Sequence, residues 1–319
     1  MMRAPASRRL PPFFAAALAC LVLLLTGCAT PQMASLQQRW PDDLPAVATA
    51  GKVPFYPQED YQCGPAALAM AASAAGVSLR PENVLDQVYL PTRKGSLQLE
   101  MLAAPRQFGM LGYRLKPEMK ILLQEVAAGH PAIVLQNLSL SLFPVWHYAV
   151  VTGFDRNRNV VRLHSGPSRD MEMSLYVFER TWERAGYWAM LTLPPSQLPA
   201  TADPGSYAAA VMAMELAAPA AAQAAYETGL QKWPRHATLL LGAGNTAYAL
   251  GRLDAALRAY RELTRQHPGY ADGWNNMAQT LLDQGKTAEA TAAIRRAVEL
   301  GGERLPRYLE LQKEILARR

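Results

Sequence analysis

The sequence predicts an α+β domain followed by an all-α domain, and three observations support this division. In the first part of the chain, alternating apolar runs typical of strands are mixed with helical patterns. In the last third, the pattern is helical throughout and rich in alanine. Between them lies "LPPSQLPATADPGS", which contains four prolines in fourteen residues. We therefore expect domains over residues 51–195 and 206–319, joined by a linker over residues 196–205.

The N-terminus has the features of a secretory signal. Three arginines precede an apolar run, Phe13 to Leu25, which is too short to cross a bilayer comfortably. The run ends in "LTGC", which resembles the lipobox of bacterial lipoproteins. This resemblance implies a signal peptide over residues 1–27, and acylation of Cys28 with chains such as palmitate. We expect a lipid-anchored protein of the bacterial cell envelope, in the outer membrane facing the periplasm.

Neither the region after Cys28, nor the net charge, nor any further motif indicates another binding partner. Residues 28–50 are rich in proline and weakly patterned, so we expect a tether between lipid and domain. Removal of the signal takes three arginines from a formal charge of +6 and leaves +3, which is too small to imply nucleic acid. The sequence has no metal-ligand motif, phosphate loop or dinucleotide fingerprint, so no metal or cofactor is expected.

Cys63 is the first candidate functional residue of the α+β domain. It is the only cysteine after residue 28, which leaves it without a disulfide partner in the mature chain. Gly64 and Pro65 follow it and precede "AALAMAASAA", a strong helix former, so Cys63 is expected at a helix N-terminus. The backbone N–H groups there favour a thiolate. We expect Cys63 to be alkylated at neutral pH faster than a free cysteine.

His147 is the best candidate for the base that such a thiol needs. It lies in "WHYAVVTGF", where strand alternation places small side chains beside the imidazole. Three other histidines have simpler explanations: His130 lies in a Gly-Pro turn, and His236 and His267 lie at boundaries within the helical part. We expect loss of His147 to slow alkylation of the thiol at least tenfold.

The residues around the two candidates resemble a known family. "PQEDYQCGPAALAM", "GHPAIVL" and "WHYAVVTGFD" are similar to motifs of papain-like cysteine peptidases that remove double-glycine leaders from bacteriocins. They are more similar still to the versions found on bacterial lipoproteins with a tetratricopeptide tail. The resemblance covers about residues 50–195. It implies a papain-like fold, Cys63 as nucleophile, His147 as general base and acid, and an upstream glutamine as oxyanion donor. Gln58 is the best match, although it precedes the cysteine by five residues and not six.

The third member of the site departs from the family, which usually has Asp-Pro on the strand after the histidine. The corresponding stretch here, "VVRLHSG", has His164 and Ser165. Asp155 is too distant, because eight strand residues span about 26 Å. If "DRNRN" closes a hairpin, pairing of Phe154 with Val160 places Ser165 on the face of His147, and the neighbouring register selects His164. Both remain candidates for orienting the imidazole.

The residues that line a narrow substrate pocket also remain open. Tyr61, Phe143 and Trp146 are the aromatic candidates, because all three lie close in sequence to Cys63 or His147.

The C-terminal part repeats with a period of 34 residues. This spacing separates Pro234 from Pro268, Gly251 from Gly285, Ala256 from Ala290 and Ala259 from Ala293. The pattern resembles tetratricopeptide repeats, with units over about 237–270 and 271–304 and a capping helix after them. The resemblance implies a concave face that binds a peptide or a partner protein.

Three functions are consistent with these features. The first is a lipid-anchored cysteine peptidase that cleaves a peptide or protein substrate through an acyl-enzyme, with the repeats recruiting the substrate or a partner. The second is a catalytically weak or inactive papain-like domain that binds peptides. The third is an envelope adaptor that acts through its repeats. A transferase or amidase could use the same cysteine and histidine.

Overall fold

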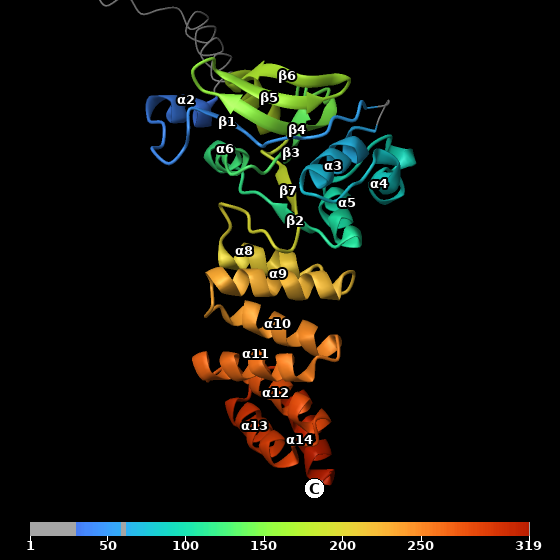
Figure 1. Ribbon diagram of the computed structural model, residues 1–319, viewed down its shortest axis with the longest axis vertical. Coiled ribbons are helices and arrows are strands. Elements are labelled where there is room, and N and C mark those ends of the chain that lie inside the picture. The colour runs from blue at the N-terminus through green and yellow to red at the C-terminus, as the bar shows by residue number, and fades with distance from the viewer. Residues whose placement is uncertain (1–29, 59–61, 319) are drawn as a thin grey trace, which may run out of the picture.

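The computed structural model describes residues 30–58 and 62–318 (Figure 1). The expected signal peptide and Cys28 lie outside these residues, as does Tyr61. In the described part, strands and helices are mixed up to β7, and every element after β7 is a helix. The predicted fold class, an α+β domain followed by an all-α domain, is confirmed.

The N-terminal domain is built on an antiparallel sheet with the strand order β2-β7-β3-β4-β5-β6, and β1 pairs with the far end of β4. Its strands are β1 Val47–Thr49, β2 Leu111–Arg114, β3 Ala132–Asn137, β4 Trp146–Asp155, β5 Val160–Ser165, β6 Ser168–Ser174 and β7 Ala189–Leu193. Strands β3 and β7 are buried along their whole length, and β4 along most of it, so these three form the centre of the core.

Helices cover both sides of this sheet. They are α2 Pro31–Gln38, α3 Cys63–Ala74, α4 Pro81–Val88, α5 Gln98–Ala103, α6 Met119–Ala127 and α7 Leu175–Glu183, with short 3-10 turns at η1 Pro91–Arg93 and η2 Ala104–Phe108. In Figure 1, α3, α4 and α5 lie together on one side, and α2 and α6 lie on the other. Helix α3 packs on β4, and α7 packs on β3. The alanine-rich sequence of α3 allows this close approach, since its residues from Gly64 to Ala72 are all buried.

The expectation of a tether over residues 28–50 is wrong for its described part. Helix α2 begins at Pro31, and the backbone N–H groups of Gln32 and Met33 donate to the carboxylate of Glu179 at 2.9 and 2.7 Å. The negative charge stabilises the N-terminal end of the helix. The side chain of Met33 is fully buried, and β1 joins the sheet. The local sequence pattern does not reveal these contacts, because the residues that hold the segment are distant in the sequence.

The C-terminal domain is a stack of helices (Figure 1). They are α8 Pro204–Met212, α9 Pro219–Lys232, α10 Ala237–Ala249, α11 Leu253–Gln266, α12 Ala271–Asp283, α13 Thr287–Leu300 and α14 Leu305–Ala317. The glycines of the repeat are explained by the turns, because Gly251 and Gly285 have φ angles of +71° and +73°. Ala256 and Ala290 are fully buried where the helices cross.

The two domains share one hydrophobic core. The buried cluster that contains the sheet continues through Tyr207, Tyr226 and Leu239 of the first helices of the repeat domain. Glu125 of α6 also holds the linker, because its buried carboxylate accepts hydrogen bonds from the backbone N–H groups of Ala200 and Thr201. The proline-rich connection is therefore bound to the N-terminal domain at Glu125, and the first helices of the repeat domain pack against that domain.

Replacement of Glu125 by alanine is expected to destabilise this junction by about 3 kcal/mol, since it leaves buried N–H groups without an acceptor. Burial by itself raises the pKa of Glu125, but hydrogen bonds from His130, Thr201 and Ala200 hold the pKa below its ordinary value. The stabilisation is therefore present above the unfolded pKa of about 4.3. It is lost as the pH falls through the lower pKa of the folded state.

Urea unfolding of the wild type and Glu125→Ala at pH 7 and pH 3 measures this contribution. Glu303→Ala, at an exposed glutamate, is the matched control and should unfold like the wild type. An equal difference in the free energy of unfolding between the wild type and Glu125→Ala at both pH values would contradict this role of the Glu125 carboxylate.

Candidate active site

Cys63 is the first residue of α3, as the sequence predicted, and its thiol is mostly buried. Burial raises the pKa of the thiol, and hydrogen bonds from the backbone N–H groups of Tyr148, Gly64 and Cys63 itself lower it. Burial has the larger effect, so the pKa lies above its ordinary value. The backbone N–H groups at the helix N-terminus favour the thiolate, as expected, but burial of the thiol outweighs them. The thiol is protonated at neutral pH until a base removes its proton.

The thiol lies against an open stretch of β4. The last pair between β4 and β5 is Val150 with His164, so the backbone of β4 nearer its start is not covered by β5. The N–H of Tyr148 in this stretch points to the sulfur of Cys63. The amide of Gln58 lies at the same edge and donates to the carbonyl of Tyr148 at 3.5 Å. The structure therefore brings Cys63 and Gln58 together beside Tyr148, the residue that follows His147 in the sequence.

His147 is oriented by a neighbouring strand. Its Nε2 lies 2.9 Å from Oγ of Ser165 on β5. Burial lowers the pKa of the imidazole, which is therefore neutral at pH 7 and able to accept a proton. Because Nε2 is engaged by the serine, Nδ1 is the ring nitrogen left for another partner.

A β-bulge decides which residue of β5 meets His147. Near the turn, Phe154 pairs with Val161, the register that would select His164. One residue of β4, Thr152, is then left without a counterpart on β5, and the register shifts by one. Beyond the bulge Val151 pairs with Leu163, which places Ser165 on the same face as His147.

His164 is turned to the opposite face, where it has a different role. Its Nε2 donates to the carbonyl of Val53 at 3.1 Å, and its Nδ1 accepts from the N–H of Asp170 at 3.2 Å. Its ring also packs edge-on against Phe55. Of the two alternatives for orienting His147, the structure places Ser165 in contact with the imidazole and His164 in a structural position.

The candidate residues line one pocket of 910 Å³. Cys63, Gln58 and His147 form part of its wall, with Trp146 beside them. A second wall is the segment from Arg93 to Leu99, which runs from the end of η1 into the first turn of α5. Of the aromatic candidates for the pocket, Trp146 lines it, whereas Phe143 lies outside it and is 70% exposed.

Two contributions to this site were not recognised from the sequence. Ser96, in the segment that forms the second wall, packs directly against Gly64. Gln136 is a fully buried polar residue on β3, opposite His147. Neither lies in a motif, and both come close to the site only through pairing or packing between distant segments. A polar residue inside the apolar run "AIVLQN" was the one available signal for Gln136.

Other kinds of site are less well supported. Among the described residues, no group of three His, Cys, Asp or Glu side chains could hold a metal ion. Within the same residues, no helix has the length and apolar character needed to cross a membrane.

The structure therefore consists of a sheet domain with a pocket that contains a cysteine and a histidine, joined to a domain of stacked helices. In agreement, residues 51–190 match the model of the Peptidase_C39 like family. Residues 207–271 and 241–304 match the tetratricopeptide repeat. The chain therefore carries a Peptidase_C39-like domain followed by tetratricopeptide repeats.

Three solved structures are each similar to a part of this chain. The peptidase domain of Streptococcus ComA, a bifunctional ABC transporter, is 23% identical, with 45% of this chain and 99% of that chain covered and a TM-score of 0.38. The Yersinia enterocolitica secretion chaperone SycD, in complex with a peptide of the translocator YopD, is 19% identical, with coverage of 36% and 87% and a TM-score of 0.32. The Sgt2 repeat domain of Aspergillus fumigatus is 21% identical, with coverage of 36% and 77% and a TM-score of 0.32. No curated protein matches the chain.

Proposed function

We propose that this chain is a lipid-anchored cysteine peptidase that hydrolyses a peptide bond through an acyl-enzyme on Cys63. The observation that carries the proposal is the convergence of Cys63, His147 and Gln58 on one pocket, with the imidazole held by Ser165. A thiol, a neutral imidazole and an amide donor are the groups that acyl transfer requires.

The proposed reaction starts from the neutral pair. Nε2–H of His147 donates to Ser165, and Nδ1 takes the thiol proton as the sulfur attacks the substrate carbonyl. The N–H of Cys63 and the amide of Gln58 donate to the oxyanion. The imidazolium then gives its proton to the leaving amine, which departs and leaves a thioester. Water, deprotonated by His147, hydrolyses the thioester and restores the thiol.

The rim of the pocket favours a peptide with apolar side chains near the cleaved bond. The segment "LSLSLFPVW", residues 138–146, has no charged residue and leads directly into His147. Its Leu142 and Phe143 are 80% and 70% exposed, and Val145 and Trp146 line the pocket itself. Exposed apolar surface of this kind, next to a reactive pocket, is typical of a binding surface.

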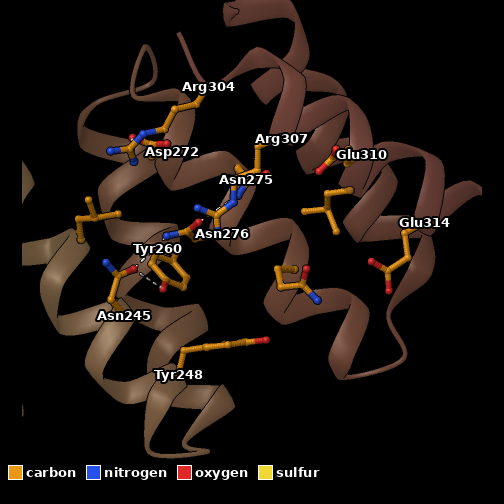
Figure 2. A pocket seen from close by; sticks show the side chains of 13 residues that line it. Asn245, Tyr248, Tyr260, Asp272, Asn275, Asn276, Arg304, Arg307, Glu310 and Glu314 are labelled. Atoms are coloured by element: carbon orange, nitrogen blue, oxygen red, sulfur yellow. Dashed lines mark hydrogen bonds and ion pairs between the residues drawn. The ribbon is translucent and has the colours of Figure 1, made fainter. Parts of the chain in front are cut away.

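The repeats are proposed to recruit the substrate or a protein partner. Helices α10, α12 and α14 enclose a second pocket of 480 Å³ (Figure 2). Figure 2 shows Asn245 accepting hydrogen bonds from the hydroxyl of Tyr260 and the amide of Asn276, at 2.8 and 2.9 Å. Arg304 and Arg307 line the same pocket. Amide and guanidinium groups in a concave surface suit the backbone and carboxylates of a peptide.

Membrane attachment through Cys28 is part of the proposal. Because α2 begins at Pro31 and is held by Glu179, an acyl chain on Cys28 would be separated from the folded domain by only a few residues. The bacterial outer membrane, on its periplasmic side, is the proposed location.

The alternative is a catalytically weak or inactive papain-like lipoprotein that binds peptides and acts as an envelope adaptor through its repeats. Two observations favour it. Ser165 is neutral, so it stabilises an imidazolium less than a carboxylate does, and burial raises the pKa of the Cys63 thiol.

Reaction with a peptide chloromethyl ketone separates the two functions. The probe carries apolar residues that direct it to the pocket, where its chloromethyl group alkylates a thiolate. Mass spectrometry should find it on Cys63 in the wild type, and incubation of the wild type with a peptide mixture should produce new termini that Cys63→Ala does not produce. Binding of the same peptides without labelling or cleavage would reject the peptidase and support the adaptor.

Loss of the orienting hydroxyl should have a smaller effect. Ser165→Ala is expected to slow cleavage about tenfold at pH 7, because the imidazole loses the contact that fixes its ring. Ser165→Asn should retain most of the rate, since its amide oxygen can accept from the same nitrogen. Ser168→Ala, at an exposed serine on β6, is the control. Steady-state cleavage rates of the wild type and the three variants test this prediction. Equal rates for Ser165→Ala and the wild type would exclude an orienting role of Ser165.

A further inference from the structure

Gln136 is a polar side chain in the centre of an apolar sheet, and its position relates it to His147. It is fully buried, and it pairs directly with His147 across β3 and β4. Residues that are paired in this way point to the same face, with Cβ atoms about 5 Å apart. The amide of Gln136 therefore lies beside the imidazole, on the face that α7 covers.

The orientation of the amide is determined by α7. Its Nε2 lies 2.6 Å from Oγ1 of Thr181, and 3.9 Å from the sulfur of Met173. The hydroxyl of Thr181 donates within its own helix, to the carbonyls of Phe178 and Val177 at 2.9 and 3.2 Å. Thr181 therefore accepts from Gln136, and the nitrogen end of the amide faces α7. The other end, Oε1, is buried without a hydrogen-bond partner in the described structure.

A buried carbonyl oxygen without a partner destabilises a fold, so its presence beside a functional group requires an explanation. A leucine or methionine would fill the same space without this cost. The oxygen is the negative end of the amide dipole, and His147, the cross-strand partner of Gln136, becomes positively charged in the proposed reaction.

The other groups around His147 do not supply a negative charge. From α3 the pocket has Cys63, and from the segment between α4 and α5 it has Arg93 and Lys94. From β4 itself it has Tyr148, and from the turn after α7 it has Ala185. Arg184, the charged residue next to Ala185, donates to the carbonyl of Ser139. Among the described residues that line the pocket, none is a carboxylate.

We propose that Gln136 is a positioning residue of this site, whose Oε1 stabilises the imidazolium of His147 from the side opposite Ser165. This inference rests on the proposed role of His147 as the base. The two neutral oxygens, one on β3 and one on β5, flank the imidazole and together take the place of a single carboxylate. Thr181 acts through Gln136 by holding its amide in this orientation.

Titration of His147 tests the proposal without any substrate. The imidazole C–H resonance of His147 is assigned as the one missing in His147→Ala, and its midpoint is measured by NMR. Gln136→Met removes the oxygen and keeps the volume, so the midpoint should fall. Gln136→Glu places a carboxylate beside the ring, so the midpoint should rise by about one pH unit or more. Alkylation of Cys63 by iodoacetamide at pH 7 should be about tenfold slower in Gln136→Met.

The control is Gln223→Met, which removes another buried glutamine, in α9, and should leave the midpoint of His147 unchanged. A purely structural Gln136 would alter thermal stability in both variants but leave the midpoint at its wild-type value, and this result would overturn the proposal. If Gln136→Glu does not fold, the midpoint of His147 in Gln136→Met tests the proposal by itself. The midpoints are independent of the chloromethyl ketone experiment, so shifted midpoints with no labelling of Cys63 would reject the peptidase and retain the coupling.

Discussion

Replacement of His147 by alanine should slow peptide cleavage at pH 7 by about 1000-fold, within the range that a positioned general base and acid contributes. The physical reason is the protonation state of the thiol. Burial raises the pKa of Cys63, so few molecules carry a thiolate at pH 7 unless a neighbouring base accepts the proton. Burial lowers the pKa of His147, which keeps it neutral and available for this step.

The pH dependence of alkylation isolates this step from substrate binding. At pH 7, iodoacetamide should modify Cys63 at least tenfold faster in the wild type than in His147→Ala. The difference should disappear as the pH rises through the raised pKa of the thiol, because the thiolate then forms without help. On the acid side, the wild-type rate should fall as the pH drops through the lowered pKa of His147, which places this limb below the ordinary pKa of about 6.5.

The matched control is His267→Ala, which removes an imidazole from the boundary between α11 and α12. It should cleave and react like the wild type. Equal alkylation rates in the wild type and His147→Ala at pH 7 would refute the pairing of the thiol with this imidazole.

Gly64→Ala should have the second-largest effect, with cleavage reduced about 100-fold and the protein destabilised by about 2 kcal/mol. A Cβ at this position would lie 2.6 Å from Cβ of Ser96 and in contact with its hydroxyl. Neither side can give way easily, because Gly64 lies in the first turn of α3 and Ser96 forms the opposite wall of the pocket. The methyl group would push the thiol away from β4.

Two further variants separate this clash from a general effect of replacing glycine. Gly205→Ala, in the first turn of α8, has no contact closer than 3.5 Å and should be neutral or slightly stabilising. Gly64→Ala combined with Ser96→Gly removes the opposing side chain and should recover part of the lost rate. Wild-type activity in Gly64→Ala alone would show that the two walls are not in close contact. Circular dichroism and urea unfolding measure the stability of each protein.

The sequence by itself determined the features that depend on near neighbours. Helix α3 begins at Cys63 because Gly64, Pro65 and an alanine-rich segment follow it, and these are local helix signals. His147 lies on a strand because alternation and β-branched residues surround it. The repeat was visible as a period of 34 residues, and the structure shows why glycine is needed in its turns.

The tertiary structure alone decided the features that depend on contacts between distant segments. A bulge at Thr152 selected Ser165 over His164, and a one-residue shift of this kind leaves no trace in the alternation of β5. Burial reversed the direction of the pKa shift expected for Cys63, because desolvation depends on what packs over the helix end and not on the helix itself. The same holds for the segment from Thr30 to Ala50, because Glu179, which binds the N-terminal end of its helix, lies more than a hundred residues away in the sequence.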